Sequence, residues 1–301
     1  DGGESRMINQ SKRVSIIGIV CVFLALLWMT GCDNDPSNSD TEIHDMYETT
    51  IDGVEYDLEY LLIQPDDSVP HPLVIFTHGR DGPYPDRYTG EVNTYQFLCA
   101  ALAEQGYAAM FLVRRGYGNS DGPDSELKDT PFDSGLEAAK DLESAVRFMR
   151  TQSCVDPDNI VVMGHSQGGW AAIAFSTLTV DGVLGTVNLS GGVNYTGINS
   201  DSLSTRHSKW ISDCGEYGKI NMIPTLWIYS PNDQSIPGDI SQQMYQSFRD
   251  NGGQGTFIMK PSYSTNGHMF LGEPGFYMGD LLAFFDSIGM NADVQPLEPG
   301  A

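Results

Sequence analysis

A chain of 301 residues can form one large α/β domain or two small ones. Hydrophobic residues make up 40% of it, as is ordinary for a globular protein, whereas the net charge of −24 argues against a nucleic-acid partner, because phosphate binding requires a basic face. An acidic surface is typical of a highly soluble protein or of one from a salt-rich habitat, and it does not identify a substrate.

The beginning of the sequence has the pattern of a secretion signal. Lys12 and Arg13 precede an apolar run at residues 14–29, which is short for a membrane span and typical of a signal core. We expect Met7 to be the start of translation, with residues 1–6 as an upstream artefact.

The apolar run leads to Thr30-Gly31-Cys32, and this segment resembles the signal of a bacterial lipoprotein, with Met29 where leucine is usual. The resemblance implies that residues 1–31 are removed and that Cys32 is lipidated. An uncleaved membrane anchor is the alternative. In both cases the rest of the chain would lie outside the cytoplasm, held at a membrane of the cell envelope.

Residues 32–46 are polar and lack apolar periodicity, so we expect a flexible tether there, followed by a catalytic domain at residues 47–301. Beyond the signal and Cys32, three cysteines remain, Cys99, Cys154 and Cys214. One disulfide could form among them, and the sequence does not select it. No spacing suggests a structural metal, and we expect neither metal nor cofactor.

The first half of this domain alternates strands and helices. Residues 47–51 and 54–62 read as an antiparallel pair joined at Asp52-Gly53, a favourable hairpin turn. The next predicted elements are a buried strand at 73–77, a helix at 93–105, a strand at 107–113 and a helix at 132–152. In the glycine-rich loop after residue 113, Arg115 and Tyr117 are candidate substrate contacts, with loop packing as the alternative.

A nucleophile elbow follows. After a turn at residues 156–158, an apolar β-branched run leads into Gly164-His165-Ser166-Gln167-Gly168 and then into an alanine-rich helix. A Gly-x-Ser-x-Gly pentapeptide between a strand and a helix exposes its serine on a strained turn. The helix start directs free backbone N–H groups at the serine.

The second half continues the alternation, with strands at 183–189, 224–230 and 256–259 and helices at 238–249 and 276–288. Residues 193–222 break the rhythm, so we interpret them as a small insertion before the penultimate strand. This segment is either a lid near the site, with Trp210 as a pocket residue, or a plain surface excursion. The predicted fold is a mostly parallel twisted sheet with helices on both faces.

Strand ends supply the remaining candidate site residues. Asp233 follows one late strand and His268 lies in the loop after the last, so we predict a triad with Ser166 as nucleophile, His268 as base and Asp233 as its orienting acid. Asp239 is a rival acid, less well placed inside a predicted helix.

An oxyanion hole in such a site uses backbone N–H groups. We predict donors at Gln167 and Arg80, with Gly79 close by. His78 is expected to shape that loop structurally, and His165, next to the serine, is a further candidate for the pocket.

Taken together, the His78-Gly79 strand end, the loop at 115–118, the elbow, and the ordered Asp233 and His268 resemble the α/β-hydrolase family over residues 47–289. The chain is most similar to its dienelactone-hydrolase-like and prolyl-oligopeptidase-like branches. Dienelactone hydrolases carry a cysteine nucleophile, and Ser166 here favours generic ester chemistry.

The resemblance implies a serine hydrolase that cleaves a small ester or acyl substrate through an acyl-enzyme. A serine peptidase acting on short peptides and a non-catalytic binding lipoprotein remain as alternatives. The sequence leaves the natural substrate and the oligomeric state open.

Overall fold

The computed structural model describes residues 40–80, 95–124, 128–195 and 198–292. Their core is one eight-stranded sheet, whose strands lie in the order β1-β2-β4-β3-β5-β6-β7-β8. The pairs β1–β2 and β2–β4 are antiparallel, and every pair from β4–β3 to β7–β8 is parallel. The strands are β1 Thr41–Ile51, β2 Val54–Gln64, β3 His71–Thr77, β4 Ala108–Leu112, β5 Val155–His165, β6 Val183–Leu189, β7 Thr225–Tyr229 and β8 Gly255–Met259.

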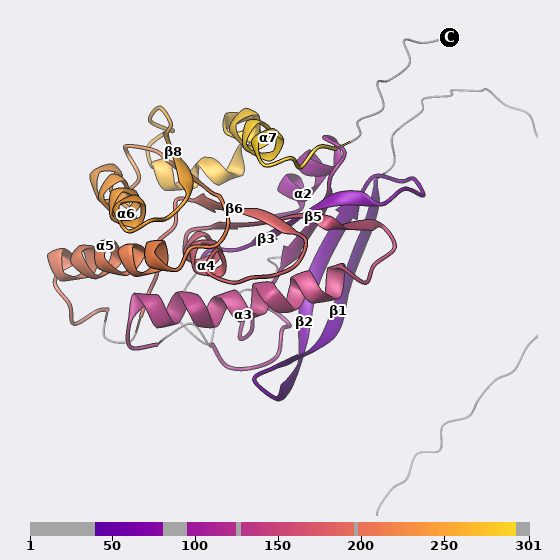
Figure 1. Cartoon of the computed structure of the whole chain (residues 1–301), viewed down its shortest axis with the longest axis horizontal. Coiled ribbons are helices and arrows are strands. Elements are labelled where there is room, and N and C mark those ends of the chain that lie inside the picture. Colours follow the sequence, from indigo (N-terminus) through magenta and orange to yellow (C-terminus); the bar gives the residue numbers. More distant parts are fainter. Residues whose placement is uncertain (1–39, 81–94, 125–127, 196–197, 293–301) are drawn as a thin grey trace, which may run out of the picture. The chain divides into compact units, whose positions relative to one another are not determined.

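Helices cover both faces of this sheet (Figure 1). On one face, side chains of α3, α4, α5 and α6 pack with the sheet, and on the other those of α2 and α7 do so. The helices are α2 Gln96–Ala103, α3 Pro131–Met149, α4 Gln167–Phe175, α5 Leu203–Lys219, α6 Gly238–Asp250 and α7 Met278–Ser287, with short 3₁₀ turns η1 Gly267–Gly272 and η2 Pro274–Phe276. The predicted fold class is confirmed.

The pattern of burial explains why the central strands read as continuous apolar runs. All but the first residue of β3 and every residue of β4 and β7 are buried, because parallel strands covered on both faces need apolar side chains throughout. The hairpin turn at Asp52 and Gly53 has positive φ at both residues, as a two-residue turn of this kind requires.

The hairpin begins earlier than predicted. Pairing with β2 extends to Thr41, so residues 41–46 belong to an edge strand and not to a tether. Their side chains are mostly exposed, and backbone pairing holds them without apolar alternation. Likewise, residues 156–158 lie inside β5 and do not form the turn predicted before it.

The segment at 193–222 is not an insertion. Its helix α5 connects the parallel strands β6 and β7, and a parallel pair needs such a crossover. Buried Trp210, Cys214 and Tyr217 attach α5 to the core, although its other positions are mostly polar.

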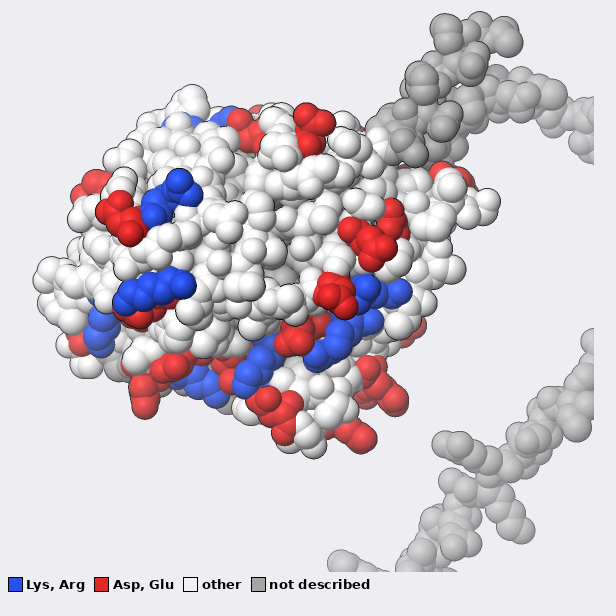
Figure 2. All heavy atoms as spheres, viewed as in Figure 1, with Lys and Arg blue, Asp and Glu red and all other residues white. Residues whose placement is uncertain are grey.

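Several properties of the described residues bear on the other sequence predictions. Cys99, Cys154 and Cys214 are free thiols. Within the described ranges, no helix is both long and apolar enough to span a bilayer. Figure 2 shows acidic side chains interspersed with the basic ones on one face of the molecule. The predicted signal and Cys32 lie outside the described residues.

Candidate active site

Ser166 occupies the tight turn between β5 and α4, as predicted. Its backbone has φ 53° and ψ −118°, a strained conformation for any residue with a side chain. The flanking glycines are required by space: a Cβ on Gly164 would lie 2.1 Å from the carbonyl oxygen of Gly168. A Cβ on Gly168 would lie 2.5 Å from the carbonyl oxygen of His78. The turn therefore requires glycine on both sides of the serine, because no larger residue fits there.

Backbone hydrogen bonds attach the turn to the neighbouring strand. The N–H of Ser166 donates to the carbonyl of Leu189 at 2.9 Å, and its own carbonyl accepts from the N–H of Gly192 at 3.1 Å. The serine is thus held by β6 as well as by its own strand and helix.

Asp233 and His268 form the predicted pair. The Nδ1 of His268 lies 2.9 Å from Oδ2 of Asp233, whose side chain is fully buried. The other carboxylate oxygen accepts the N–H groups of Ser235 and Ile236, each at 2.8 Å. Burial acts to raise the pKa of Asp233, but the hydrogen bonds from His268 and from these two N–H groups prevail and hold the pKa below its ordinary value.

This pairing defines the tautomer of the histidine. An ionised carboxylate only accepts hydrogen bonds, so Nδ1 of His268 carries the proton and Nε2 of the neutral ring has a free lone pair. The rival acid Asp239 lies in the first turn of α6, while His268 bonds to Asp233.

Two asparagines that the sequence did not single out hold the histidine loop. Oδ1 of Asn266 accepts the N–H of His268 at 3.1 Å and that of Gln234 at 3.0 Å. The carbonyl of Asn232 accepts the N–H of Gly267 at 3.0 Å. An asparagine before a short turn is a common capping residue, which is the signal that could have identified Asn266.

Ser166 and His268 open onto one pocket of about 330 Å³. Trp210 of α5, a predicted pocket residue, lines it and donates its indole N–H to the carbonyl of Val193. The remaining lining residues are Arg80, Gln167, Gly192, Val193, Asn194, Ile198, Leu203, Arg206, Ser235 and Ile236. Several of these residues are apolar, and the pocket volume lies at the small end of the usual range for ligand sites.

The residues predicted for the oxyanion hole surround the serine. A Cβ on Gly79 would lie 2.9 Å from Cβ of Ser166, so this position must be a glycine. Arg80 and Gln167 line the pocket, and the guanidinium of Arg80 pairs with Asp124 at 3.1 Å.

His78 beneath this loop is fully buried, as expected for a structural residue. Its Nδ1–H donates to the carbonyl of Gly79 and its Nε2 accepts the N–H of Arg114. Acceptance at Nε2 requires the neutral ring, and burial holds the pKa of His78 well below its ordinary value.

Two predicted pocket residues face elsewhere. The guanidinium of Arg115 is buried in ion pairs with Asp141 and Glu137, and Tyr117 packs edge-on against His78 with ring centroids 4.6 Å apart. Their loop turns back onto the fold through residues of positive φ at Gly116 and Gly118. Packing, the alternative to substrate contact, is therefore the observed role of both.

His165, also predicted for the pocket, is not among its lining residues. The side chain is directed toward the histidine loop, with Nε2 2.9 Å from the carbonyl oxygen of His268.

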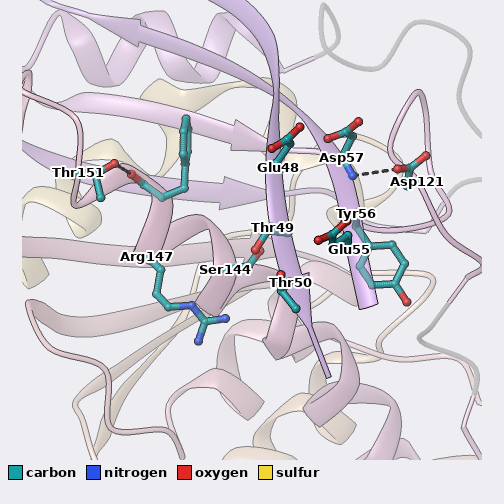
Figure 3. A pocket seen from close by; sticks show the side chains of 11 residues that line it. Glu48, Thr49, Thr50, Glu55, Tyr56, Asp57, Asp121, Ser144, Arg147 and Thr151 are labelled. Carbon is teal, nitrogen blue, oxygen red and sulfur yellow. Dashed lines mark hydrogen bonds between the residues drawn. The ribbon is translucent and has the colours of Figure 1, made fainter. Parts of the chain in front are cut away.

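A second and larger hollow, of about 740 Å³, lies beside β1, β2 and α3 (Figure 3). It is lined by Glu48, Thr49, Thr50, Glu55, Tyr56, Asp57, Asp121, Ser144, Arg147, Phe148 and Thr151. Its one serine, Ser144, already donates its hydroxyl to the carbonyl of Asp141, and the lining includes no histidine. Size alone would favour this hollow, but Ser166 and His268 line the smaller pocket.

Comparison with known proteins identifies relatives in sequence and in fold. The chain is 30% identical over 113 residues to the quorum-quenching protein AidA of Acinetobacter baumannii, a match that covers 38% of this chain and 33% of that protein. The chain thus matches about a third of the length of this relative.

Solved structures share the fold. A candidate dienelactone hydrolase from Klebsiella pneumoniae superposes with a TM-score of 0.55 at 18% identity, covering 82% of this chain and 99% of that one. The acylaminoacyl peptidase of Pyrococcus horikoshii gives a TM-score of 0.57 at 20% identity, covering 85% of this chain and 43% of that one. The two branches inferred from the motifs are thus found among the structural neighbours.

A family model extends over the elbow, the acid and the histidine. It matches residues 74–273 and describes the alpha/beta hydrolase family. With this match over most of the described domain, the protein belongs to the α/β-hydrolase family.

Proposed function

We propose that this protein is a serine hydrolase that cleaves ester bonds of small substrates through an acyl-enzyme on Ser166. The observation that carries the proposal is the hydrogen bond between Nδ1 of His268 and Asp233, together with the pocket that His268 and Ser166 both line. Such a pair leaves Nε2 of His268 ready to accept the serine proton.

The reaction would proceed in two halves. In the first, Oγ of Ser166 attacks the ester carbonyl as His268 takes its proton, and the alcohol leaves with that proton. Backbone N–H groups of Gln167 and of the Gly79–Arg80 loop bind the oxyanion, and Asp233 stabilises the charged imidazole. In the second, His268 takes a proton from water as the water attacks the acyl carbon; the bond to Oγ of Ser166 then breaks, His268 returns the proton to Oγ, and the acid is released.

Short p-nitrophenyl esters and aminoacyl anilides, offered in parallel to the purified protein, test the substrate class. We expect ester hydrolysis that Ser166→Ala abolishes, and a pocket of about 330 Å³ supports a preference for short acyl groups. Faster turnover of anilides would favour a peptidase. Failure of a fluorophosphonate probe to label Ser166 would exclude an activated serine.

We also propose that the protein is anchored to a bacterial membrane through Cys32. The supporting observation is the basic, apolar and small-residue pattern that leads to Thr30-Gly31-Cys32. Cys32→Ala should abolish incorporation of radiolabelled palmitate and leave the precursor unprocessed, and unchanged labelling would refute the lipoprotein assignment.

A further inference from the structure

His165 directly precedes the nucleophile, yet its side chain serves another element. It is the last residue of β5 and is 8% exposed. Its Nε2 lies 2.9 Å from the carbonyl oxygen of His268, and the two imidazole rings lie 4.7 Å apart between centroids at 47°. A strand residue adjacent to Ser166 therefore contacts the backbone of the proposed catalytic base.

The chemistry of this contact fixes the role of each atom. A carbonyl oxygen only accepts, so Nε2 of His165 carries a proton and donates it. Burial, reinforced by the nearby His268, lowers the pKa of His165 to about 3, so the ring is neutral near pH 7. Because burial lowers its pKa, the ring of His165 is a weak base and is poorly suited to take the proton of Ser166.

Three contacts fix His268, and they come from different parts of the fold. Asp233, after β7, holds the ring, and Asn266, within the loop itself, holds the backbone N–H. The bond from His165 holds the carbonyl on the other side of the same residue. Of the three, this bond alone comes from the strand that carries Ser166, so it ties the base directly to the nucleophile.

We propose that His165 is a positioning residue, which sets the distance between His268 and Ser166 by hydrogen-bonding the main-chain carbonyl of His268. This inference rests on the proposed hydrolase function. Without the bond, the backbone of His268 would move relative to the serine, and the contact of its ring with Asp233 would loosen. A displacement of about 1 Å between reacting groups can cost about 10²-fold in rate.

Three substitutions separate the hydrogen bond from the size of the side chain. His165→Gln places an amide N–H near the position of the imidazole Nε2, His165→Met has the same length without a donor, and His165→Asn has a donor that is too short to reach. We expect kcat toward a p-nitrophenyl ester to fall about 10-fold or more in the Met and Asn variants, with KM within about 3-fold, and to stay within about 3-fold of wild type in the Gln variant.

The comparison remains decisive if one variant is unstable. Thermal unfolding is measured for all three, and if the Met variant does not fold, the Asn and Gln variants make the comparison. Equal losses in all variants, no loss in any, or a loss confined to KM would overturn the positioning role.

A second measurement needs no turnover. Proton NMR of the full protein should show the Nδ1–H of His268, bonded to Asp233, in wild type and in His165→Gln, and broadened by exchange in the Met and Asn variants. Inactivity of the wild type toward esters would refute the proposed function. An unchanged Nδ1–H signal in the Met and Asn variants would refute the role of His165.

Discussion

The turns after β5 and β6 have similar backbones and different surroundings. Each holds a serine with positive φ, 53° at Ser166 and 48° at Ser190. Each serine N–H donates to the end of the next strand, Ser166 to Leu189 and Ser190 to Ile228, both at 2.9 Å. The backbone arrangement around Ser166 is thus repeated one strand away.

The side chains differ in access and in partners. Ser166 opens onto the pocket that His268 also lines, whereas Ser190 is fully buried and its hydroxyl has no hydrogen-bond partner among the described residues. A strained serine at a strand end is therefore not enough to form a nucleophile. The turn of the proposed nucleophile is the one that also has a histidine, an open pocket and a helix start directed at it.

The largest effect should come from removing the proposed nucleophile or its base. Ser166→Ala and His268→Ala should each lower kcat by about 10⁴-fold or more, and the double variant little further, because members of a triad act as a unit. Ser190→Ala should stay within about 3-fold of wild type. Ester hydrolysis by variants with wild-type circular dichroism is the measurement. A comparable loss in Ser190→Ala would show that the two turns are not functionally distinct.

The acid that orients the base should rank next. In Asp233→Asn the amide can donate to Nδ1 of His268, which moves the ring proton to Nε2 and removes the base, so kcat should fall about 10⁴-fold. Asp239→Asn changes the rival acid in the first turn of α6. It should have little effect on kcat and serves as the control. If Asp233→Asn kept the wild-type kcat and KM, the pair with His268 would have no catalytic role.

The sequence predicted the turn at Ser166 because its requirements are local. Gly164 and Gly168 leave no space for a side chain, the strand before them is apolar, and a helix with several alanines follows. All of this is visible in one short stretch of sequence. Asp233 and His268 were accessible because parallel strands bring their carboxyl ends to one edge.

Contacts that depend on tertiary packing were not predictable. The polar strand at residues 41–46 exists because β2 offers backbone partners, and α5 looked like an insertion because only a few of its side chains are apolar. Arg115 was predicted as a pocket residue because the sequence does not show its ion pair with the buried carboxylate of Asp141. The bond from His165 to the carbonyl of His268 joins residues 103 positions apart, and a carbonyl has no signature in a sequence.

The residue before each serine determines how the two turns contribute to the loss of folding stability at low pH. His165 precedes Ser166, and Leu189 precedes Ser190. Because the pKa of His165 is about 3 in the fold and about 6.5 when unfolded, the unfolded chain binds the proton first, and stability is lost as pH falls from 6.5 toward 3. Between pH 7 and pH 5 the loss from His165 should be about 2 kcal/mol, and buried His78 adds a loss of the same sign.

Urea denaturation at pH 7 and pH 5 measures this loss. His165→Gln, which has no titrating ring, should reduce the difference by about 2 kcal/mol. Asp233 stays ionised throughout this range because its pKa is lowered, so it contributes nothing to the change. A difference that persists unchanged in His165→Gln would mean that His165 is not buried in its neutral form.

The smallest effect concerns the strain that the two turns share. At Ser190, glycine would adopt positive φ without the cost that a side chain imposes, and would also remove the unpaired buried hydroxyl. Alanine would remove the hydroxyl alone, so comparing Ser190→Gly with Ser190→Ala isolates the backbone term. The greater freedom of glycine in the unfolded chain offsets part of the gain, and we expect Ser190→Gly to be the more stable of the two by about 0.5–1 kcal/mol in urea denaturation. Both variants should keep wild-type kcat, since Ser190 does not reach the pocket. If Ser190→Ala were the more stable variant, the turn after β6 would be relaxed, and strain would belong to the turn of Ser166 alone.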